Sequence, residues 1–357
     1  MLKTYSNSVS SKRNILLIYT GGTIGMVQDY HTNQLIPFDF SDFEKQIPEI
    51  RNLSATIQAV SFDEALDSSN MGLEHWQKLA HLVYDNYDQY DGFVILHGSD
   101  TMAYTASALS FMFVNLSKPV ILTGSQLPIG MVRTDGKENL ITAIEIASDY
   151  RKDMPMVPEV AVYFEYHLYR GNRTYKFNAE HFEAFQSPNY PVLAEAGVTI
   201  KYNDRFINKP SKLPFRIETD LDNRVAVFTL FPGISQHIVE AALNIQDNLV
   251  LVVRTYGSGN AMTYPWFLEA LQKASDRGLI LINATQCRGG GVTQGKYETS
   301  GELERIGLIS AGDMQMEAVI AKSMYLLGQG LSNAEFRLYF EQDLRGERTA
   351  YELNSTD

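Results

Sequence analysis

Two polar segments of this 357-residue chain place hydroxyl groups beside glycines, a pattern that can support nucleophilic catalysis. The segment TGGTIG (residues 20–25) presents Thr23 after two glycines, which let a backbone turn sharply and approach a ligand closely. The same residues also fit a glycine-rich turn or a dinucleotide-binding loop. However, they lack both the full G-x-G-x-x-G pattern and the lysine of a phosphate-binding loop. Local sequence alone leaves these alternatives open.

The segment HGSDTM (residues 97–102) groups Ser99, Asp100 and Thr101 at the expected start of a helix. A helix start offers free amide groups, so the segment fits either a binding site or a simple helix cap by Ser99 or Asp100. For Asp67 and the two serines that follow it, capping is the better local interpretation. Lys176 is either an ordinary surface lysine or, if buried beside a hydroxyl, a base.

Composition excludes several other kinds of chemistry. The only cysteine is Cys287, so neither an intramolecular disulfide nor a cysteine-based zinc cluster is expected. The seven histidines form no metal-binding pair, and we expect no metal and no organic cofactor. The net charge of −12 argues against nucleic acid or an anionic membrane as a partner. The polar amino terminus lacks the apolar stretch of a signal peptide, and we expect a cytoplasmic protein.

Alternating strands and helices must position these segments. Short apolar runs end in glycine or turn residues and indicate buried parallel strands at residues 14–19, 92–96, 119–122, 224–230, 249–254 and 279–283. Helical periodicity or composition predicts helices over residues 73–87 and 102–115, and Ser332 to Glu335 forms a capping-box pattern that opens a terminal helix. Ligands of open parallel sheets bind at the carboxyl ends of the strands, where both polar segments fall.

The alternation predicts an α/β protein with two domains. A larger amino-terminal Rossmann-like, flavodoxin-like domain with a parallel-rich sheet is expected over residues 1–203, and a smaller Rossmann-like domain over residues 224–357. Residues 204–223 break the alternation, contain two prolines and little apolar periodicity, and are interpreted as a linker.

Taken together and in order, these segments resemble the L-asparaginase family, most closely its cytoplasmic bacterial type I branch. The resemblance runs from about Ile15 to Glu347. It is carried by YTGGTIGM (residues 19–26) and DGFVILHGSDTMAYTASALSFM (91–112). Supporting matches are DSSNM (67–71), TGSQLP (123–128), LYRGNRT-K (168–176), SPN (187–189), YGSGNA (256–261), ATQC (284–287) and LRGE (344–347).

The resemblance implies a role for each matching residue. Thr23 corresponds to the nucleophile, Lys176 serves the second catalytic hydroxyl on Ser99, and Asp100 pairs with the α-ammonium group of the substrate. Residues implied to bind substrate are Gly22, Asp67, Ser68, Ser69 and Gly98, together with Asn260, which is expected to reach a neighbouring subunit's site.

The chain departs from the family pattern at three positions. The family's second catalytic threonine is Ser99 here, which keeps the hydroxyl and loses a methyl group. The family's loop tyrosine aligns with Leu35, and Tyr30 is the only tyrosine nearby. Tyr30 therefore remains a candidate base, on a loop over residues 26–36 that is expected to act as a lid. A possible allosteric asparagine site is implied at Arg254 and Cys287, where the usual threonine is replaced by Tyr175.

The implied activity is hydrolysis of L-asparagine to L-aspartate and ammonia through a threonine nucleophile and an acyl-enzyme, by a homodimer or homotetramer. Three rival interpretations stay open. An amidase of the same fold could act on glutamine or on charged tRNA, which the acidic charge disfavours. A non-catalytic amino-acid sensor would not need Thr23 or Lys176. A nucleotide-binding protein is disfavoured by the missing motifs.

Overall fold

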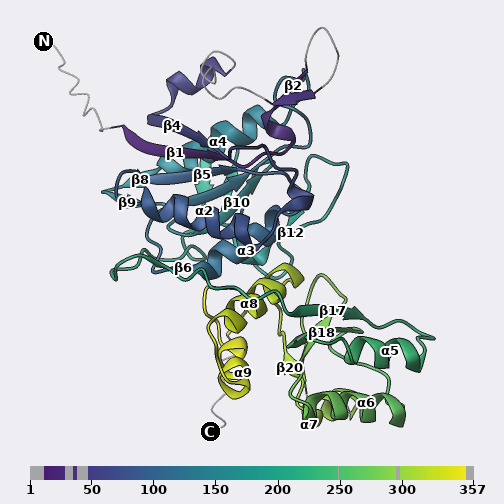
Figure 1. The fold of residues 1–357 in the computed structure, drawn as a ribbon. Helices are drawn as coiled ribbons and strands as arrows, with labels where there is room; N and C mark the ends of the chain where they lie inside the picture. The colour runs from purple at the N-terminus through teal and green to yellow at the C-terminus, as the bar shows by residue number, and fades with distance from the viewer. Residues whose placement is uncertain (1–11, 29–34, 38–46, 248, 295–297, 351–357) are drawn as a thin grey trace, which may run out of the picture.

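A computed structural model describes residues 12–28, 35–37, 47–247, 249–294 and 298–350 of the chain. In this part the chain forms two lobes, each built on its own sheet (Figure 1). The larger lobe holds the amino-terminal half, and the smaller one holds most of the carboxy-terminal half. The predicted α/β class is therefore confirmed.

The larger lobe is built on an eight-stranded sheet in the order β15-β14-β11-β10-β7-β5-β1-β4. Its strands are β1 (Arg13–Tyr19), β4 (Ala55–Ser61), β5 (Gly92–Leu96), β7 (Val120–Thr123), β10 (Val160–Phe164), β11 (His167–Arg170), β14 (Ala194–Ala196) and β15 (Ile200–Tyr202). Strands β4, β1, β5, β7 and β10 are parallel, and the remaining pairs are antiparallel.

The parallel part of this sheet has the flavodoxin-like strand order. Numbered along the chain, its strands lie in the order 2-1-3-4-5, and the order reverses between β1 and β5. Ligands bind at such a reversal, outside the carboxyl ends of the strands. The two segments that follow β1 and β5 are TGGTIG and HGSDTM, so the fold places both at the expected binding crevice.

Helices cover both faces of the sheet, which explains why β1 is apolar and buried from Ile15 to Tyr19. Leu16 and Ile18 pack in one core with α2 (Leu73–Asp85) and α3 (Met102–Met112). Ile15 and Leu17 point the other way and pack in a second core with α4 (Gly136–Ser148). Short 3-10 turns are η1 (Thr23–Gly25), η3 (Pro48–Asn52), η4 (Ser68–Asn70) and η5 (Gly171–Arg173).

The smaller lobe contains a four-stranded parallel sheet in the order β17-β18-β19-β20. Its elements are β17 (Val225–Thr229), α5 (Gln236–Leu243), β18 (Val250–Thr255), α6 (Pro265–Asp276), β19 (Ile280–Thr285), α7 (Glu298–Ile306) and β20 (Ile309–Ser310). The predicted terminal helix is α9 (Asn333–Glu341), where Ser332 accepts from the Glu335 amide at 3.3 Å and completes the capping box.

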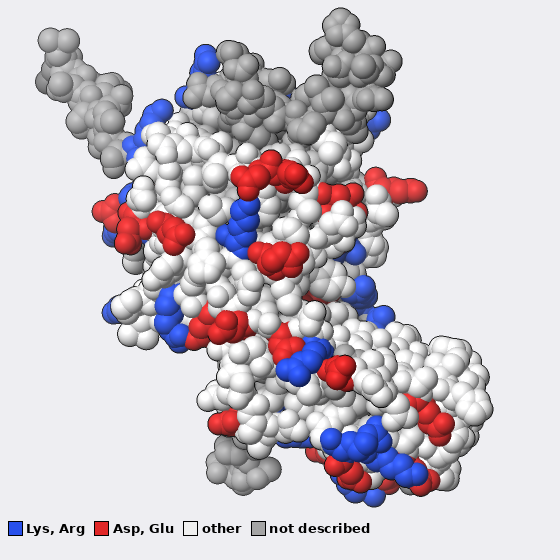
Figure 2. All heavy atoms as spheres, viewed as in Figure 1, with Lys and Arg blue, Asp and Glu red and all other residues white. Residues whose placement is uncertain are grey.

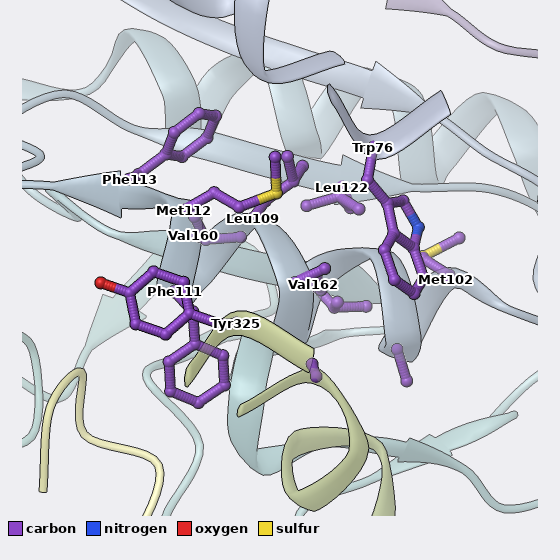
Figure 3. Packing of buried hydrophobic residues seen from close by; sticks show 14 of the residues in the cluster. Trp76, Met102, Leu109, Phe111, Met112, Phe113, Leu122, Val160, Val162 and Tyr325 are labelled. Carbon is purple, nitrogen blue, oxygen red and sulfur yellow. The ribbon is translucent and has the colours of Figure 1, made fainter. Parts of the chain in front are cut away.

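Helix α8 (Met316–Gly328) joins the two lobes. It packs on α3, and the Phe111 and Tyr325 rings stack with 5.9 Å between their centroids (Figure 3). One buried cluster continues from the β-strands of the larger lobe through α3 and α8 into the smaller lobe. The lobes are therefore held together by a shared apolar core.

The proposed linker at residues 204–223 pairs with the larger lobe. Its β16 (Arg216–Ile217) forms a two-residue antiparallel bridge with β6 (Phe113–Val114), which ends α3 earlier than the predicted residue 115. The domain boundaries themselves stay a prediction. The other two-stranded pairings are β2 (Met26–Gln28) with β3 (Leu35–Pro37), β8 (Tyr150–Arg151) with β9 (Met154–Pro155), and β12 (Tyr175–Lys176) with β13 (Phe185–Gln186).

Acidic and basic side chains are interspersed over the face shown in Figure 2. None of the helices within the described ranges is long and apolar enough to span a bilayer.

Candidate active site

The loops after β1 and β5 touch through their glycines. A Cβ atom on Gly22 would lie 2.5 Å from the Gly98 Cα atom, so only glycine permits this approach. Gly22 also has a φ of +88°, which an L side chain rarely adopts. A Cβ on Gly98 would in turn lie 2.6 Å from the Ser68 hydroxyl oxygen. The backbone thus brings together the segments that carry Thr23, Ser99 and Ser68.

Thr23 is the first residue of η1 and is half-buried. The turn before it is anchored by Thr20, whose backbone amide and hydroxyl both donate to the Leu96 carbonyl at 3.0 Å. Beneath the turn, the Tyr19 hydroxyl donates to the Gly25 carbonyl at 3.2 Å, and burial raises the Tyr19 pKa to about 12. Tyr19 is therefore a neutral support for this loop at physiological pH.

Ser99, Asp100 and Lys176 form one hydrogen-bonded group, although Lys176 lies 77 residues after Ser99. The Lys176 ammonium donates to the Ser99 hydroxyl oxygen at 2.8 Å and to the Asp100 carboxylate at 2.6 Å. The Lys176 side chain is 17% exposed and that of Asp100 is 68% exposed. Lys176 is thus mostly buried, and Asp100 is open to an incoming ligand.

Helix α3 begins at Met102 with Thr101 at its N-cap position, and no side chain caps it there. The interpretation of Ser99 or Asp100 as a cap of this helix is therefore wrong. Thr101 instead donates its hydroxyl to the Ser68 carbonyl at 2.7 Å, which ties this loop to the Asp67 segment.

Gln126 is a site residue to which the sequence analysis assigned no role. It follows β7, the next strand of the sheet, and its side-chain carbonyl accepts from the Ser99 hydroxyl at 3.3 Å. Its side-chain amide donates to the His181 carbonyl at 3.0 Å, and its backbone amide donates to Asp135 at 2.8 Å. The Ser99 oxygen therefore accepts from Lys176 while its proton points to Gln126. The sequence signals were its place at a strand end and its position in the TGSQLP segment that resembles the family.

Asp67 caps η4, as its local sequence indicated. Its carboxylate accepts from the Ser69 backbone amide at 2.9 Å and from the Ser69 hydroxyl at 2.6 Å. These bonds, led by the one from the hydroxyl, lower the Asp67 pKa. Ser68 is buried and lies against Gly98, so the segment lies beside the loops that carry Thr23 and Ser99.

The strand that carries Lys176 is held by buried arginines. Arg173 donates to the Gly346 carbonyl at 2.6 Å and to the Asp313 carboxylate at 2.9 Å. Arg170 pairs with Glu159 at 2.6 Å, with both side chains almost fully buried. The contact between Arg173 and Gly346 fastens the segment before Lys176 to the carboxy-terminal LRGE segment.

The residues of the possible allosteric site lie around a second charged cluster. The Arg288 guanidinium lies 4.5 Å from the Tyr175 ring centroid and pairs with buried Glu317 at 3.4 Å. Burial raises the Glu317 pKa, and the charges of Arg288 and Arg254 oppose that shift. Cys287 directly precedes Arg288 in the sequence, and its side chain is exposed. Neither Arg288 nor Glu317 was predicted as a site residue from the sequence.

Two predicted site residues stay outside this group. Tyr30 lies outside the described residues. Asn260 lies in a turn of the smaller lobe, where its backbone amide donates to the Tyr256 carbonyl at 2.8 Å. Within the ranges that the structure describes, no group of three or more histidine, cysteine or acidic side chains could hold a metal ion.

Comparison with protein families gives two matches that together cover most of the chain. The family described as "Asparaginase, N-terminal" matches residues 14–208, and the "Glutaminase/Asparaginase C-terminal domain" matches residues 224–340. Among curated proteins, L-asparaginase 1 of Escherichia coli K12 is 42% identical over 346 residues, which cover 95% of this chain and 98% of that protein.

Solved structures of asparaginases are also similar to this chain. L-asparaginase I of Vibrio cholerae superposes with a TM-score of 0.87 at 40% identity, covering 95% of this chain and 100% of that one. A probable cytoplasmic L-asparaginase of Campylobacter jejuni superposes with a TM-score of 0.77 at 25% identity, covering 93% and 100%.

Proposed function

We propose that this chain, which belongs to the asparaginase family, is an amidohydrolase that converts L-asparagine to L-aspartate and ammonia. The observation that carries the proposal is the Ser99–Asp100–Lys176 group, placed at the strand-order reversal beside the loop of Thr23. A hydroxyl, an ammonium and an open carboxylate converge there, which are groups that can support amide hydrolysis and bind the charged end of an amino acid.

In the proposed reaction, the Thr23 hydroxyl oxygen bonds to the side-chain amide carbon of asparagine. Tyr30 or the Ser99–Lys176 pair takes the threonine proton, and protonation of the amide nitrogen lets it leave as ammonia. Water then attacks the ester, aspartate leaves, and the Thr23 hydroxyl is restored. Backbone amides near Gly98 and Ser99 stabilise the oxyanion, an interaction that contributes roughly 3–4 kcal/mol per donor in other enzymes.

Substrate recognition is proposed to use the loops around this group. Asp100 pairs with the α-ammonium group, and Ser68 and Ser69 bind the α-amino and α-carboxylate groups, with Gly22, Gly98 and Asp67 shaping the pocket. The exposed Asp100 carboxylate supports this role, because it can exchange its Lys176 contact for a ligand contact. Glutamine is one methylene longer, a difference worth only about 1–3 kcal/mol, so a slower glutaminase activity is expected.

We further propose a cytoplasmic homodimer or homotetramer in which Asn260 reaches a neighbouring subunit's site. The name of the Campylobacter relative supports the location. A second asparagine site at Arg254, Cys287 and Tyr175 is also proposed. Its test is kinetic: sigmoidal dependence on asparagine that Cys287→Ala abolishes supports it, and hyperbolic kinetics in the unaltered protein refute it.

The activity is tested by ammonia release from L-asparagine and, separately, from L-glutamine, with Thr23→Ala as the inactive variant. Thr199→Ala, at an exposed threonine between β14 and β15, is the matched control and should keep full activity. Release from asparagine that vanishes only in Thr23→Ala supports the proposal. No release by the folded protein refutes it, and asparagine binding by calorimetry would then favour a sensor.

A further inference from the structure

A buried chain of hydrogen bonds ends at the loop that carries Ser99. The Trp76 indole donates to the Thr105 hydroxyl oxygen at 2.9 Å, and that hydroxyl lies 2.9 Å from Nε2 of His97. On the other side of the ring, Nδ1 of His97 lies 2.7 Å from the Gly98 carbonyl oxygen. His97 and Thr105 are fully buried, and Trp76 is 7% exposed (Figure 3 shows Trp76 beside Met102, where α3 begins).

The chemistry of these groups allows one direction for the protons. The Gly98 carbonyl can only accept, so Nδ1 of His97 carries the ring proton. Burial lowers the His97 pKa to about 4, so the neutral ring has no second proton and Nε2 accepts. Thr105 donates to Nε2 and accepts from Trp76, which is a donor only. All three hydrogen bonds therefore run in one direction, from Trp76 through Thr105 and His97 to Gly98.

The Gly98 backbone needs such a support because it has no side chain of its own. A Cβ atom on Gly98 would lie 2.6 Å from the Ser68 hydroxyl oxygen and 3.5 Å from the Gly22 Cα atom. The carbonyl that His97 holds belongs to the peptide whose amide is the Ser99 N–H. Hydrogen bonds in series polarise one another, so a donor at the carbonyl strengthens the N–H of the same peptide.

We propose that His97, held in its Nδ1–H form by Thr105 and Trp76, is a positioning residue that orients the Gly98–Ser99 peptide and strengthens the Ser99 N–H as an oxyanion donor. The inference rests on the proposed amide hydrolysis. It assigns to a buried histidine that touches no substrate a part in stabilising the tetrahedral intermediate.

The decisive variant is Thr105→Val, which keeps the side-chain shape and removes the proton that fixes the His97 ring. Loss of a whole oxyanion donor costs roughly 100- to 1000-fold in kcat elsewhere, so weakening one should lower kcat roughly 3- to 30-fold. KM for asparagine should change by less than about twofold, because the ground-state amide is little affected. Thr105→Ser restores the hydroxyl and should restore kcat.

A matched control separates this role from packing. Thr142→Val makes the same change at a buried threonine on α4. The Thr142 hydroxyl donates to Glu138 at 2.9 Å and takes no part in the hydrogen bonds from Trp76 to Gly98. It should keep kcat. Thermal melting of all three variants reports any general loss of fold.

Nitrogen-15 NMR of the histidine rings provides a readout that does not depend on turnover. The unaltered protein should show His97 protonated at Nδ1 alone. Thr105→Val should increase the fraction of His97 rings that are protonated at Nε2. An unchanged kcat in Thr105→Val, an equal loss in Thr105→Ser, or a ring protonated at Nε2 would each overturn the inference. Absence of ammonia release by the unaltered protein would instead refute the proposed function. The His97 nitrogen-15 signals would still show in which direction the hydrogen bonds between Trp76 and Gly98 run.

Discussion

Removing the Asp100 charge gives two expectations that differ sharply in size. Asp100→Asn keeps the shape of the side chain and an oxygen that can accept from Lys176, which now lies 2.6 Å away. In the free protein this carboxylate pairs with Lys176, and with substrate bound it is proposed to pair with the α-ammonium group. The substitution should therefore affect stability slightly and catalysis strongly.

The magnitudes follow from exposure. The Asp100 side chain is 68% exposed, and solvent-screened ion pairs contribute about 0–1 kcal/mol to stability. A hydrogen bond to a charged group that is lost from a bound complex costs about 1.5–3 kcal/mol. Since about 1.4 kcal/mol corresponds to a tenfold change in rate, kcat/KM for asparagine should fall roughly 10- to 150-fold.

The assay compares asparagine with succinamic acid, which is asparagine without its α-amino group. Asp100→Asn should lose kcat/KM on asparagine and keep most of its low activity on succinamic acid, because that substrate offers no ammonium to pair. Glu269→Gln is the matched control. It removes a carboxylate from an exposed ion pair of 2.7 Å with Lys273 on α6 and should leave both rates unchanged.

Equal losses on the two substrates would refute the pairing of Asp100 with the ammonium group. That outcome would mean that Asp100 acts through Lys176 and Ser99 instead.

Two further predictions concern stability. Lys322→Met should destabilise the fold by about 3–5 kcal/mol in urea unfolding, because it leaves Glu347 charged and unpaired in a site where both side chains are fully buried; a loss below about 1 kcal/mol would contradict this. Glu165→Gln should stabilise the protein by on the order of 1–3 kcal/mol at about pH 8 and have no effect below about pH 4.5. Burial, with nearby acidic charges such as Asp135, raises the Glu165 pKa from 4.5 to about 7. The folded protein therefore holds a proton that the unfolded chain releases, so wild-type stability falls as the pH rises through this window. A stability difference that is the same at both pH values would contradict the assignment.

The sequence predicts six of the twelve strands in the two main sheets, because most of these six are buried on both faces and almost entirely apolar. The runs at residues 14–19 and 92–96 were predicted on this basis, and the structure has β1 and β5 there. Helix ends were less predictable where tertiary contacts decide them. The pairing of Phe113 with Ile217 ends α3, and no local residue indicated that pairing.

The site was predictable in part. Strand ends indicated where the polar loops of Thr23 and Ser99 would lie, but the local sequence around Lys176 fits a surface lysine equally well. Only the family resemblance singled it out. Gln126 and His97 were not assigned roles, because their contacts with Ser99 and Gly98 depend on how neighbouring strands and helices meet.

The most direct test of the proposed mechanism is to trap the acyl-enzyme during turnover of L-asparagine. The protein is mixed with substrate, quenched in acid within milliseconds, digested and analysed by mass spectrometry. We expect a peptide that contains Thr23 and carries one added aspartyl group, and no such adduct in Thr23→Ala. An aspartyl group on the Ser99 peptide, with Thr23 unmodified, would contradict it.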